Sequence, residues 1–383
     1  MKPIVVLSAH CEPLPTSAAS IMCDLAESLT VDRRVFFITQ AKFSFGKKCQ
    51  YGTVFGIKNP FIKSQNHHLR FLGEIIFPIL LAVSFGLYCR FIVRDYDVVA
   101  YSPTALQFPL MGILKQKNTK QVLILRDIFP GWMADANIFE RASIVFKVLD
   151  KLSSVQYSLS NVIAVQCAAD IDLLKVRFRE KCVVLNSFFK NLPSDQKSIK
   201  KINLKSVEVG CFGTFGLAQG WQDAIKDIDL ILLKHRNVHI SFFGSNNKKL
   251  EKKLFSKKVR DRVKIGGAIR GDEFSNLIKK MDIGFFSLAD EINGSNIPGK
   301  FIDYCKYGLP TFALCNLNSH IAKVIRDNRL GYVSQINDSQ MALANFSEML
   351  ANYELINKEN IYRYFESSHS VNSAKDAVNN LLS

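Results

Sequence analysis

The sequence lacks the cysteine patterns that mark a disulfide framework or a zinc site. None of its nine cysteines forms a C-x-x-C pair, and none is spaced with the seven histidines like zinc ligands. Most lie in apolar runs, which favours reduced, buried thiols in a cytosolic protein. The opening apolar run is too short for a signal peptide and predicts a buried first strand. These absences exclude a small disulfide-stapled toxin.

The sequence also has no internal repeat of about 20–50 residues and no low-complexity tract. What it has in excess is positive charge, with 50 Lys and Arg against 34 Asp and Glu over 383 residues, a formal net charge of +16. Nucleic acid, an anionic membrane surface and a phosphorylated substrate are the partners that such a surplus suits. No DNA-binding motif and no RNA-binding interleaving of aromatic and basic residues occurs, so we expect no nucleic-acid partner.

Short apolar runs alternate with helical patterns along the chain, which is typical of parallel sheets covered by helices on both faces. Since a single core stops growing at about 250–300 residues, the sequence predicts two doubly wound α/β domains in tandem. Open sheets of this kind bind ligands at the carboxyl ends of their strands, so we expect a site between the domains. The predicted parts are an N-terminal domain at 1–190, a linker at 191–206, a C-terminal domain at 207–360, and a C-terminal helix at 361–383 that packs back toward the N-terminal domain.

The expected elements follow from the same patterns. In the first domain, strands are predicted at 3–7, 35–38, 98–101, 121–125, 162–165 and 183–185, and helices at 18–29, 105–115, 143–159 and 168–177. In the second domain, strands are predicted at 207–211, 238–243, 263–265, 283–287 and 311–313, and helices at 221–233, 272–280, 298–307 and 320–327.

The segment 63–94 is unusually apolar and has basic residues at both ends. Within 71–89 only Glu74 carries a charge, which is nearly enough apolar chain to span a bilayer. Pro78, two glycines and the strand that follows argue against a span. The basic ends favour a helix that lies in an anionic membrane surface, with an ordinary buried helix or a transmembrane span as the alternatives.

The stretch 294–310 is the best candidate for a phosphate site. It follows a predicted strand and opens a helix, which Asn296 can cap and which Pro298 suits in its first turn. The free N–H groups and positive dipole end of a helix attract phosphate, and Lys300 adds a full charge. The spacing of its glycines and lysine imitates a P-loop, but Phe301 stands where Ser or Thr would bind magnesium, which excludes an ATPase.

Asp303 lies one turn after Lys300 on the same face of this predicted helix. Its carboxylate could therefore accept hydrogen bonds from sugar hydroxyls. The alternative is an ordinary solvent-facing pair between Lys300 and Asp303.

Two glycine-rich turns accompany this stretch. The turn 210–220, with Gly216 inside it, follows the first strand of the second domain and would let the backbone approach a ligand closely. It lacks the G-x-G-x-x-G spacing of a dinucleotide site, which disfavours NAD, and a plain strand–helix turn is the alternative. In the turn 266–271, Arg270 is either a ligand contact or a surface residue.

The first domain carries two further candidates. Asp127 directly follows the end of the predicted strand 121–125, where a carboxylate is a catalytic candidate; a helix cap or a pair with Arg126 is the alternative. Thr16 and Ser17 lie in the turn after the first strand, before a helix that opens with small residues, and could face the same phosphates.

Four motifs now carry a resemblance to a known family. They are R-D-I-F-P at 126–130, I-P-G-K-F-I-D-Y-C at 297–305, G-T-F-G-L-A-Q-G at 213–220, and the basic apolar helix before a D-V-V strand at 69–99. With them the whole chain resembles a GT-B-fold glycosyltransferase of the large retaining family 4. It is most similar to the bacterial branch that builds O-antigen and capsule repeat units, including transferases of the N-acetylfucosamine type.

The resemblance implies a nucleotide-diphosphate sugar donor held by the C-terminal domain and a polyprenyl-diphosphate-linked acceptor that reaches the N-terminal domain from the membrane. It implies no metal and no other cofactor, and a cytoplasmic protein that is peripheral on the inner face of the bacterial membrane. The catalytic residues would be Asp127 and Lys300. The donor-binding residues would be Gly216, Arg270, Ser295, Asn296, Ile297, Gly299 and Asp303.

The chain departs from the family at two places. The family's two carboxylates, seven residues apart, would fall at Ser295 and Asp303, so the first is absent and the second is shortened. The family's Arg and Lys in the glycine turn would fall at Thr214 and Gln219. These departures leave Lys300 and Arg270 as the cations for the donor diphosphate.

The sequence thus predicts a retaining glycosyltransferase, of hexosyl or N-acetylhexosaminyl type, in surface-polysaccharide synthesis. Two alternatives remain open. One is a sugar-nucleotide epimerase of the same fold, which would not need the apolar segment 71–89. The other is a catalytically silent, membrane-docked scaffold of a polysaccharide assembly complex.

Overall fold

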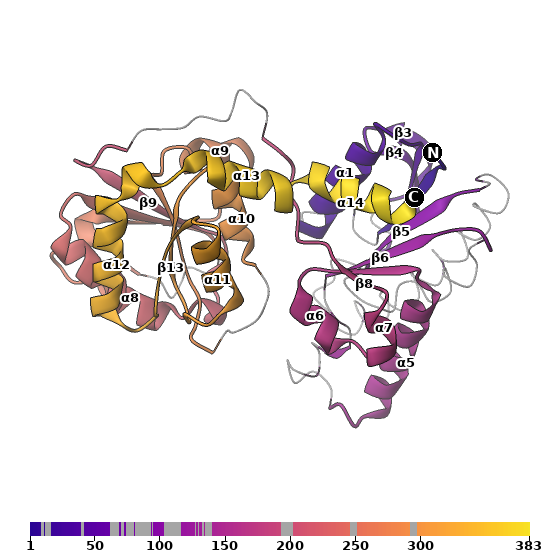
Figure 1. Ribbon diagram of the computed structural model, residues 1–383, viewed down its shortest axis with the longest axis horizontal. Coiled ribbons are helices and arrows are strands. Elements are labelled where there is room, and N and C mark those ends of the chain that lie inside the picture. Colours follow the sequence, from indigo (N-terminus) through magenta and orange to yellow (C-terminus); the bar gives the residue numbers. More distant parts are fainter. Residues whose placement is uncertain are drawn as a thin grey trace. The chain divides into compact units, whose positions relative to one another are not determined.

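The chain folds into two compact units, seen in a computed structural model (Figure 1). The first contains Met1–Lys190 and Ser370–Ser383, and the second contains Asn191–His369. The structure describes residues 1–8, 11, 17–39, 42–61, 69, 73, 80, 93, 95–102, 116–126, 128, 130, 131, 134, 140–192, 202–245, 251–291 and 297–383. The predicted helix at 105–115 and nearly all of the segment 63–94 lie outside these residues.

The second unit is built on a parallel sheet with the order β11-β10-β9-β12-β13-β14. Its strands are β9 (Val207–Phe212), β10 (Val238–Phe243), β11 (Val263–Gly266), β12 (Ile283–Ser287), β13 (Thr311–Leu314) and β14 (Gly331–Ser334). In chain order this is 3-2-1-4-5-6, so the strand order reverses between β9 and β12. In open α/β sheets, ligands bind outside the carboxyl ends of the strands at such a point.

Helices cover both faces of this sheet (Figure 1). Apolar side chains of α8 and α12 pack on alternate residues of β9, β10, β12 and β13 to form one core, and α10 and α11 lie on the opposite face. The helices of the unit are α8 (Trp221–Lys234), α9 (Gly271–Ile278), α10 (Gly299–Lys306), α11 (His320–Asp327), α12 (Ser339–Ala351) and α13 (Lys358–Ser368).

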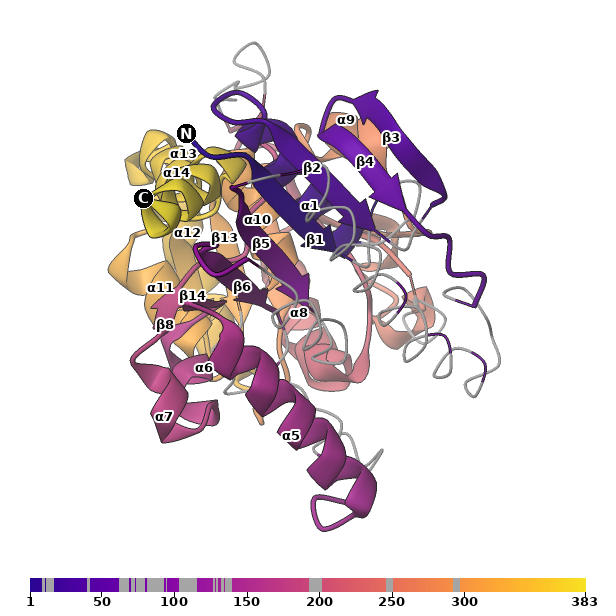
Figure 2. The same ribbon diagram turned by 90° about the vertical axis from the view of Figure 1, so that its right-hand side faces the viewer.

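The first unit has the sheet order β3-β4-β2-β1-β5-β6-β7-β8, parallel except where β3 pairs with β4 (Figure 2). Its strands are β1 (Ile4–Ser8), β2 (Val35–Thr39), β3 (Ser44–Cys49), β4 (Gly52–Gly56), β5 (Asp97–Ser102), β6 (Gln121–Leu125), β7 (Val162–Val165) and β8 (Cys182–Val184). Its helices are α1 (Ser17–Leu29), α5 (Ile144–Leu159), α6 (Ala168–Leu173), α7 (Val176–Arg179) and α14 (Val371–Leu382). Two doubly wound sheets confirm the predicted fold class.

The C-terminal stretch forms two helices, of which α13 belongs to the second unit and α14 to the first. The chain leaves α13 at His369, and the Ser370 hydroxyl caps α14 by accepting the N–H of Ser373. Val371, Ala374 and further apolar residues of α14 share a buried core with α1. No helix within the described ranges is long and apolar enough to cross a membrane.

The single helix predicted at 168–177 is wrong, because two residues of extended chain separate α6 from α7. Leu174 leaves the helical conformation with a ψ of 150° and is buried in the core of this face. The guanidinium of Arg179 donates to the carbonyls of Leu174 and Asp172, at 3.2 Å and 2.8 Å. The interruption therefore gains apolar burial while its carbonyl groups keep hydrogen-bond partners.

The strands β9 and β12 separate at the point where the strand order reverses. Their pairing ends at Gly210 and Gly284. Beyond it, the Tyr304 hydroxyl of α10 donates to the Phe285 carbonyl at 2.7 Å and accepts the Phe212 N–H at 3.3 Å. The ring of Tyr304 lies where a Cβ on Gly284 would stand. One buried side chain thus bridges the two strands and fixes α10 to both.

We expect Gly284→Ala to lower the free energy of unfolding by about 2–4 kcal/mol, because the added methyl overlaps the Tyr304 ring and breaks its two hydrogen bonds. Urea unfolding followed by circular dichroism measures the change. Gly267→Ala is the matched control, since a Cβ there meets nothing within 4 Å. Equal stability of the two variants would contradict the bridging role of Tyr304.

Candidate functional site

The turn after β9 brings the backbone close to the side chain of Lys300. Gly213 has a φ of +113°, which favours glycine, and its N–H donates to the Phe243 carbonyl at 3.0 Å. A Cβ on Gly213 would lie 3.7 Å from the Lys300 Cε. A Cβ on Gly244 would overlap the carbonyl of Gly213. The two glycines therefore allow the backbone at the ends of β9 and β10 to approach closely next to the Lys300 side chain.

The Lys300 ammonium is buried and has no hydrogen-bond partner among the described residues. The alternative of a surface pair with Asp303 is wrong, because no ion pair joins the two in the described part of the chain. Burial raises the pKa of the Cys211 thiol to about 11, and the nearby charge of Lys300 opposes this rise. A buried cation without hydrogen bonds costs free energy of folding, so this lysine does not stabilise the fold through its charge.

The amino end of α10 supplies unpaired backbone donors beside Lys300. Pro298, expected inside the first turn, is instead the N-cap residue, and the helix begins at Gly299. The N–H groups of Gly299 and Lys300 have no acceptor within the described chain, as is usual for the first residues of a helix. Ile297 directly precedes the cap. Ser295 and Asn296 lie outside the described residues, so their donor-binding roles stay predictions.

Phe301 explains why this helix is not a P-loop. Its side chain is fully buried and packs edge-on against Phe286 of β12, with the ring centroids 6.3 Å apart. The position after the lysine therefore anchors the helix to the sheet, and a hydroxyl for magnesium is absent there. Within the described ranges, no group of three or more His, Cys, Asp or Glu side chains could hold a metal ion. The expectation of a metal-free reaction stays a prediction.

Gly216 does not offer a free amide to a ligand in this structure. Its N–H donates to the Gln219 Oε1 at 2.6 Å, a contact within the turn that sequence spacing did not reveal. The same turn carries a second missed feature, in which the exposed hydroxyls of Thr214 and Ser245 lie 3.1 Å apart. Both residues follow strand ends, so the hydroxyl pair lies at the carboxyl edge of the sheet near Gly213.

Asp303 is half-buried on α10, one turn after Lys300. Burial raises the pKa of its carboxyl from 3.8 to about 6, and the neighbouring Lys306 opposes this rise. Above about pH 6 the Asp303 carboxylate is ionised and can only accept hydrogen bonds. Hydroxyl groups of a ligand could then donate to it.

Arg270 is exposed and forms the N-cap residue of α9. Four residues later, Phe274 packs edge-on against Phe212, the last residue of β9, at 5.3 Å between the ring centroids. The helix α9 is thus tied to the turn that carries Gly213. No described contact joins Arg270 to Lys300, so its role stays a prediction.

The candidates of the first unit are only partly described. Thr16 and Asp127 lie outside the described residues, and Ser17 is described only as the first residue of α1. Beside Asp127, Arg126 donates to the Tyr101 hydroxyl at 3.5 Å, and its carbonyl accepts the side-chain amide of Gln166 at 3.2 Å. These bonds attach the end of β6 to its neighbouring strands.

No protein-family model matches the sequence, and no curated protein matches it significantly. Solved structures do match. The glycosyltransferase WaaG, involved in lipopolysaccharide biosynthesis, aligns over 99% of both chains with 14% identity and a TM-score of 0.63. HepE of Anabaena, in complex with UDP, aligns over 100% of this chain and 99% of its own, with 13% identity and a TM-score of 0.64. A glycosyltransferase from Rickettsia africae aligns over 100% and 97%, with 14% identity and a TM-score of 0.65.

The chain has the GT-B fold. The similarity covers both units and not only the common doubly wound sheet of one of them. At this level of identity it establishes the fold alone, and the chemistry rests on the residues themselves.

The raised pKa of Asp303 makes stability depend on pH. The folded protein binds the proton of the Asp303 carboxyl more tightly than the unfolded chain does. The stability that this protonated carboxyl contributes is therefore lost as the pH rises from about 4 through about 6. We expect Asp303→Asn to remove this loss, so that the variant gains about 1–3 kcal/mol over the wild type across that window. Urea unfolding at a series of pH values measures the difference. A difference that is constant with pH would contradict the raised pKa.

Proposed function

We propose that the protein is a retaining glycosyltransferase that uses a nucleotide-diphosphate sugar as donor. The observation that carries the proposal is the buried ammonium of Lys300, which has no partner in the described part of the chain and lies beside Gly213, where the strand order reverses. The fold supports it, because similar structures are glycosyltransferases and one of them was solved with UDP.

The charge of Lys300 suits the leaving diphosphate. The departing nucleotide gains negative charge in the transition state, and a cation fixed in a water-poor site stabilises that charge without reorganising. The N–H groups of Gly299 and Lys300 would add donors from the end of α10. Arg270 would supply a second cation, and Asp303 would accept the ribose hydroxyls.

The rest of the reaction follows from the resemblance and from this electrostatic argument. The leaving phosphate would help to deprotonate the acceptor on the same face of the sugar, so no metal is needed. Asp127 would orient or activate the acceptor hydroxyl. We propose a polyprenyl-diphosphate-linked acceptor in O-antigen or capsule synthesis, reached by a protein that is peripheral on the cytoplasmic face of the membrane.

Lys300→Met tests the donor site. We expect the variant to bind the preferred donor about 10–100-fold more weakly, which is the loss of one charge-assisted contact to a phosphate. Calorimetric titration with UDP-, GDP- and dTDP-sugars measures the affinities. Lys323→Met, at an exposed lysine on α11, is the control. If no nucleotide sugar binds the wild type, the proposal fails.

The same variant separates function from stability. The Lys300 ammonium is buried and has no hydrogen bonds to any residue that the structure describes. Replacing it by an apolar chain of similar length should raise the free energy of unfolding without ligand by about 1–3 kcal/mol. A structural lysine would give the opposite sign. Urea unfolding of the two proteins without nucleotide decides between them.

The membrane part of the proposal rests on the sequence of 63–94. We expect Ile75→Gln combined with Ile79→Gln to weaken binding to vesicles that contain phosphatidylglycerol at least about tenfold, since each change removes apolar area from the bilayer. Vesicle flotation measures it, and Leu355→Gln, at a residue 81% exposed in the second unit, is the control. Equal flotation of both variants would favour the epimerase, which needs no membrane.

A further inference from the structure

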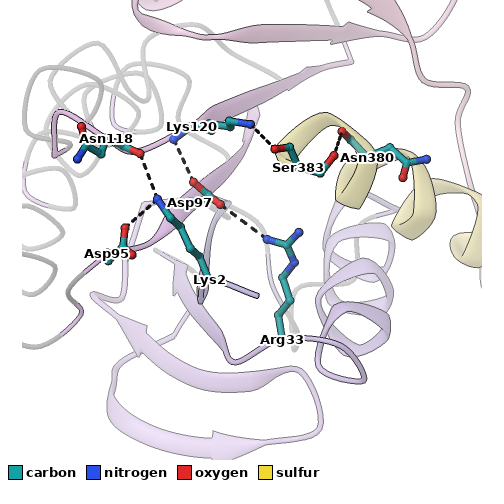
Figure 3. Close-up of polar contacts among 8 residues, drawn as sticks. All are labelled: Lys2, Arg33, Asp95, Asp97, Asn118, Lys120, Asn380 and Ser383. Atoms are coloured by element: carbon teal, nitrogen blue, oxygen red, sulfur yellow. Dashed lines mark hydrogen bonds and ion pairs between the residues drawn. The ribbon is translucent and has the colours of Figure 1, made fainter.

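A cavity of about 400 Å³, lined by both apolar and charged groups, lies in the first unit at the amino ends of β1, β5 and β6 (Figure 3). Its lining includes Lys2 before β1, Arg33 before β2, Asp97 at the start of β5 and Lys120 before β6. The last turn of α14 closes another side. Because the strands are parallel, this end of the sheet is opposite to the carboxyl ends of β1, β5 and β6.

Arg33 is the unusual residue of the cavity. Its side chain is only 5% exposed, and its Nε has no hydrogen-bond partner among the described residues. Its Nη1 lies 3.7 Å from the Asp97 carboxylate, which is too far for a hydrogen bond. Asp97 in turn accepts the backbone N–H of Lys120 at 3.1 Å through its other oxygen. The buried guanidinium thus has a counter-charge, but its Nε–H has no hydrogen-bond acceptor among the described residues.

The two lysines bring further positive charge to the rim. The Lys2 ammonium pairs with Asp95 at 2.8 Å, and the Lys120 ammonium donates to the Ser383 carbonyl oxygen at 2.7 Å (Figure 3). Lys2 and Asp95 are 39% and 68% exposed, and Lys120 is exposed as well. Such contacts are weak and exchange readily, so both ammonium groups are able to turn toward a ligand.

We propose that this cavity binds the phosphoryl group of a small phosphorylated metabolite. Three cations and one carboxylate, Asp97, line it, which favours an anion. The planar fork of Arg33 donates to two oxygens at once, and a phosphoryl group offers such oxygens while the lysines supply point charges. The volume exceeds that of a phosphate ion and falls within the range of about 300–1,000 Å³ typical of small-molecule sites, so the ligand has an organic body.

This site is separate from the proposed donor site. All its residues belong to the first unit, whereas Lys300 and Gly213 belong to the second. A ligand in the cavity would join the sheet, the end of α1 and the last turn of α14 by hydrogen bonds. Binding should therefore stabilise the first unit, independently of nucleotide binding.

Titration of the full chain with glycerol 3-phosphate, followed by ³¹P NMR and thermal unfolding, tests the proposal. The titration uses the Lys300→Met background, so that the donor site contributes little. We expect saturable binding that Lys120→Gln and Arg33→Gln each weaken at least about tenfold. Lys117→Gln is the matched control, because it removes an exposed lysine from the same β5–β6 connection without touching the cavity.

Lys120 is exposed, so its variant will fold even if loss of Arg33 destabilises the core around Asp97. Unchanged affinity in Lys120→Gln would overturn the proposal. So would an equal loss in Lys117→Gln, which would indicate general attraction to a basic protein, or the absence of saturable binding. Failure of nucleotide-sugar binding to the wild type would concern the proposed function and leave this result unaffected.

Discussion

The hydroxyl of Tyr304 fixes the geometry at the carboxyl ends of β9 and β12, where the strand order of the second unit reverses. Two neighbouring strands with helices on opposite faces must separate where the strand order reverses, and their backbone groups then lose their partners. Tyr304 supplies both missing hydrogen bonds, one to Phe285 and one from Phe212. Because the residue belongs to α10, the bridge also sets the position of Gly299 and Lys300 at the start of that helix. The opening between the strands and the cation beside it therefore have one cause.

The aromatic packing around this bridge allows an uncompensated charge to persist. The ring of Phe212 contacts both Phe274 and Tyr304 edge-on. Phe301 packs against Phe286 and thereby attaches the start of α10 to β12. A flexible loop would let Lys300 reach water. Buried aromatic rings keep α10 from moving. The packing energy of the rest of the unit therefore offsets the unfavourable free energy of burying the ammonium. That rigidity is what an electrostatic catalyst requires, since a preformed charge loses no energy in orienting itself.

The sequence predicted the parallel strands and their helices well, because a strand buried on both faces is a continuous apolar run, as at 121–125 and 283–287. It missed β14 and α12 of the second unit. It also missed the edge pair β3 and β4 of the first unit. There Phe45 is 75% exposed, and Gly46 lies where the pairing shifts register, so neither a buried face nor a regular alternation marks β3. The hydrogen bond from the Gly216 N–H to the Gln219 side chain was also not predicted, since it depends on the path of the turn and not on residue spacing. Lys300 was predicted because helix starts carry local signals, but its burial depends on strands far away in the chain.

The net charge of +16 does not by itself locate a binding site, because the basic residues lie in different environments. Lys300 and Arg33 illustrate two of these environments. The Lys300 ammonium has no hydrogen-bond or ion-pair partner among the described residues, so an anion that reached it would not have to displace one. Arg33 has Asp97 beside it, and an anion there must compete with a carboxylate that is already present. The first arrangement suits a ligand whose negative charge grows during a reaction, and the second suits reversible binding of a ligand with a fixed charge. This difference between the two cations would distinguish the proposed donor site, where charge develops during the reaction, from the proposed phosphoryl site, where the ligand only binds.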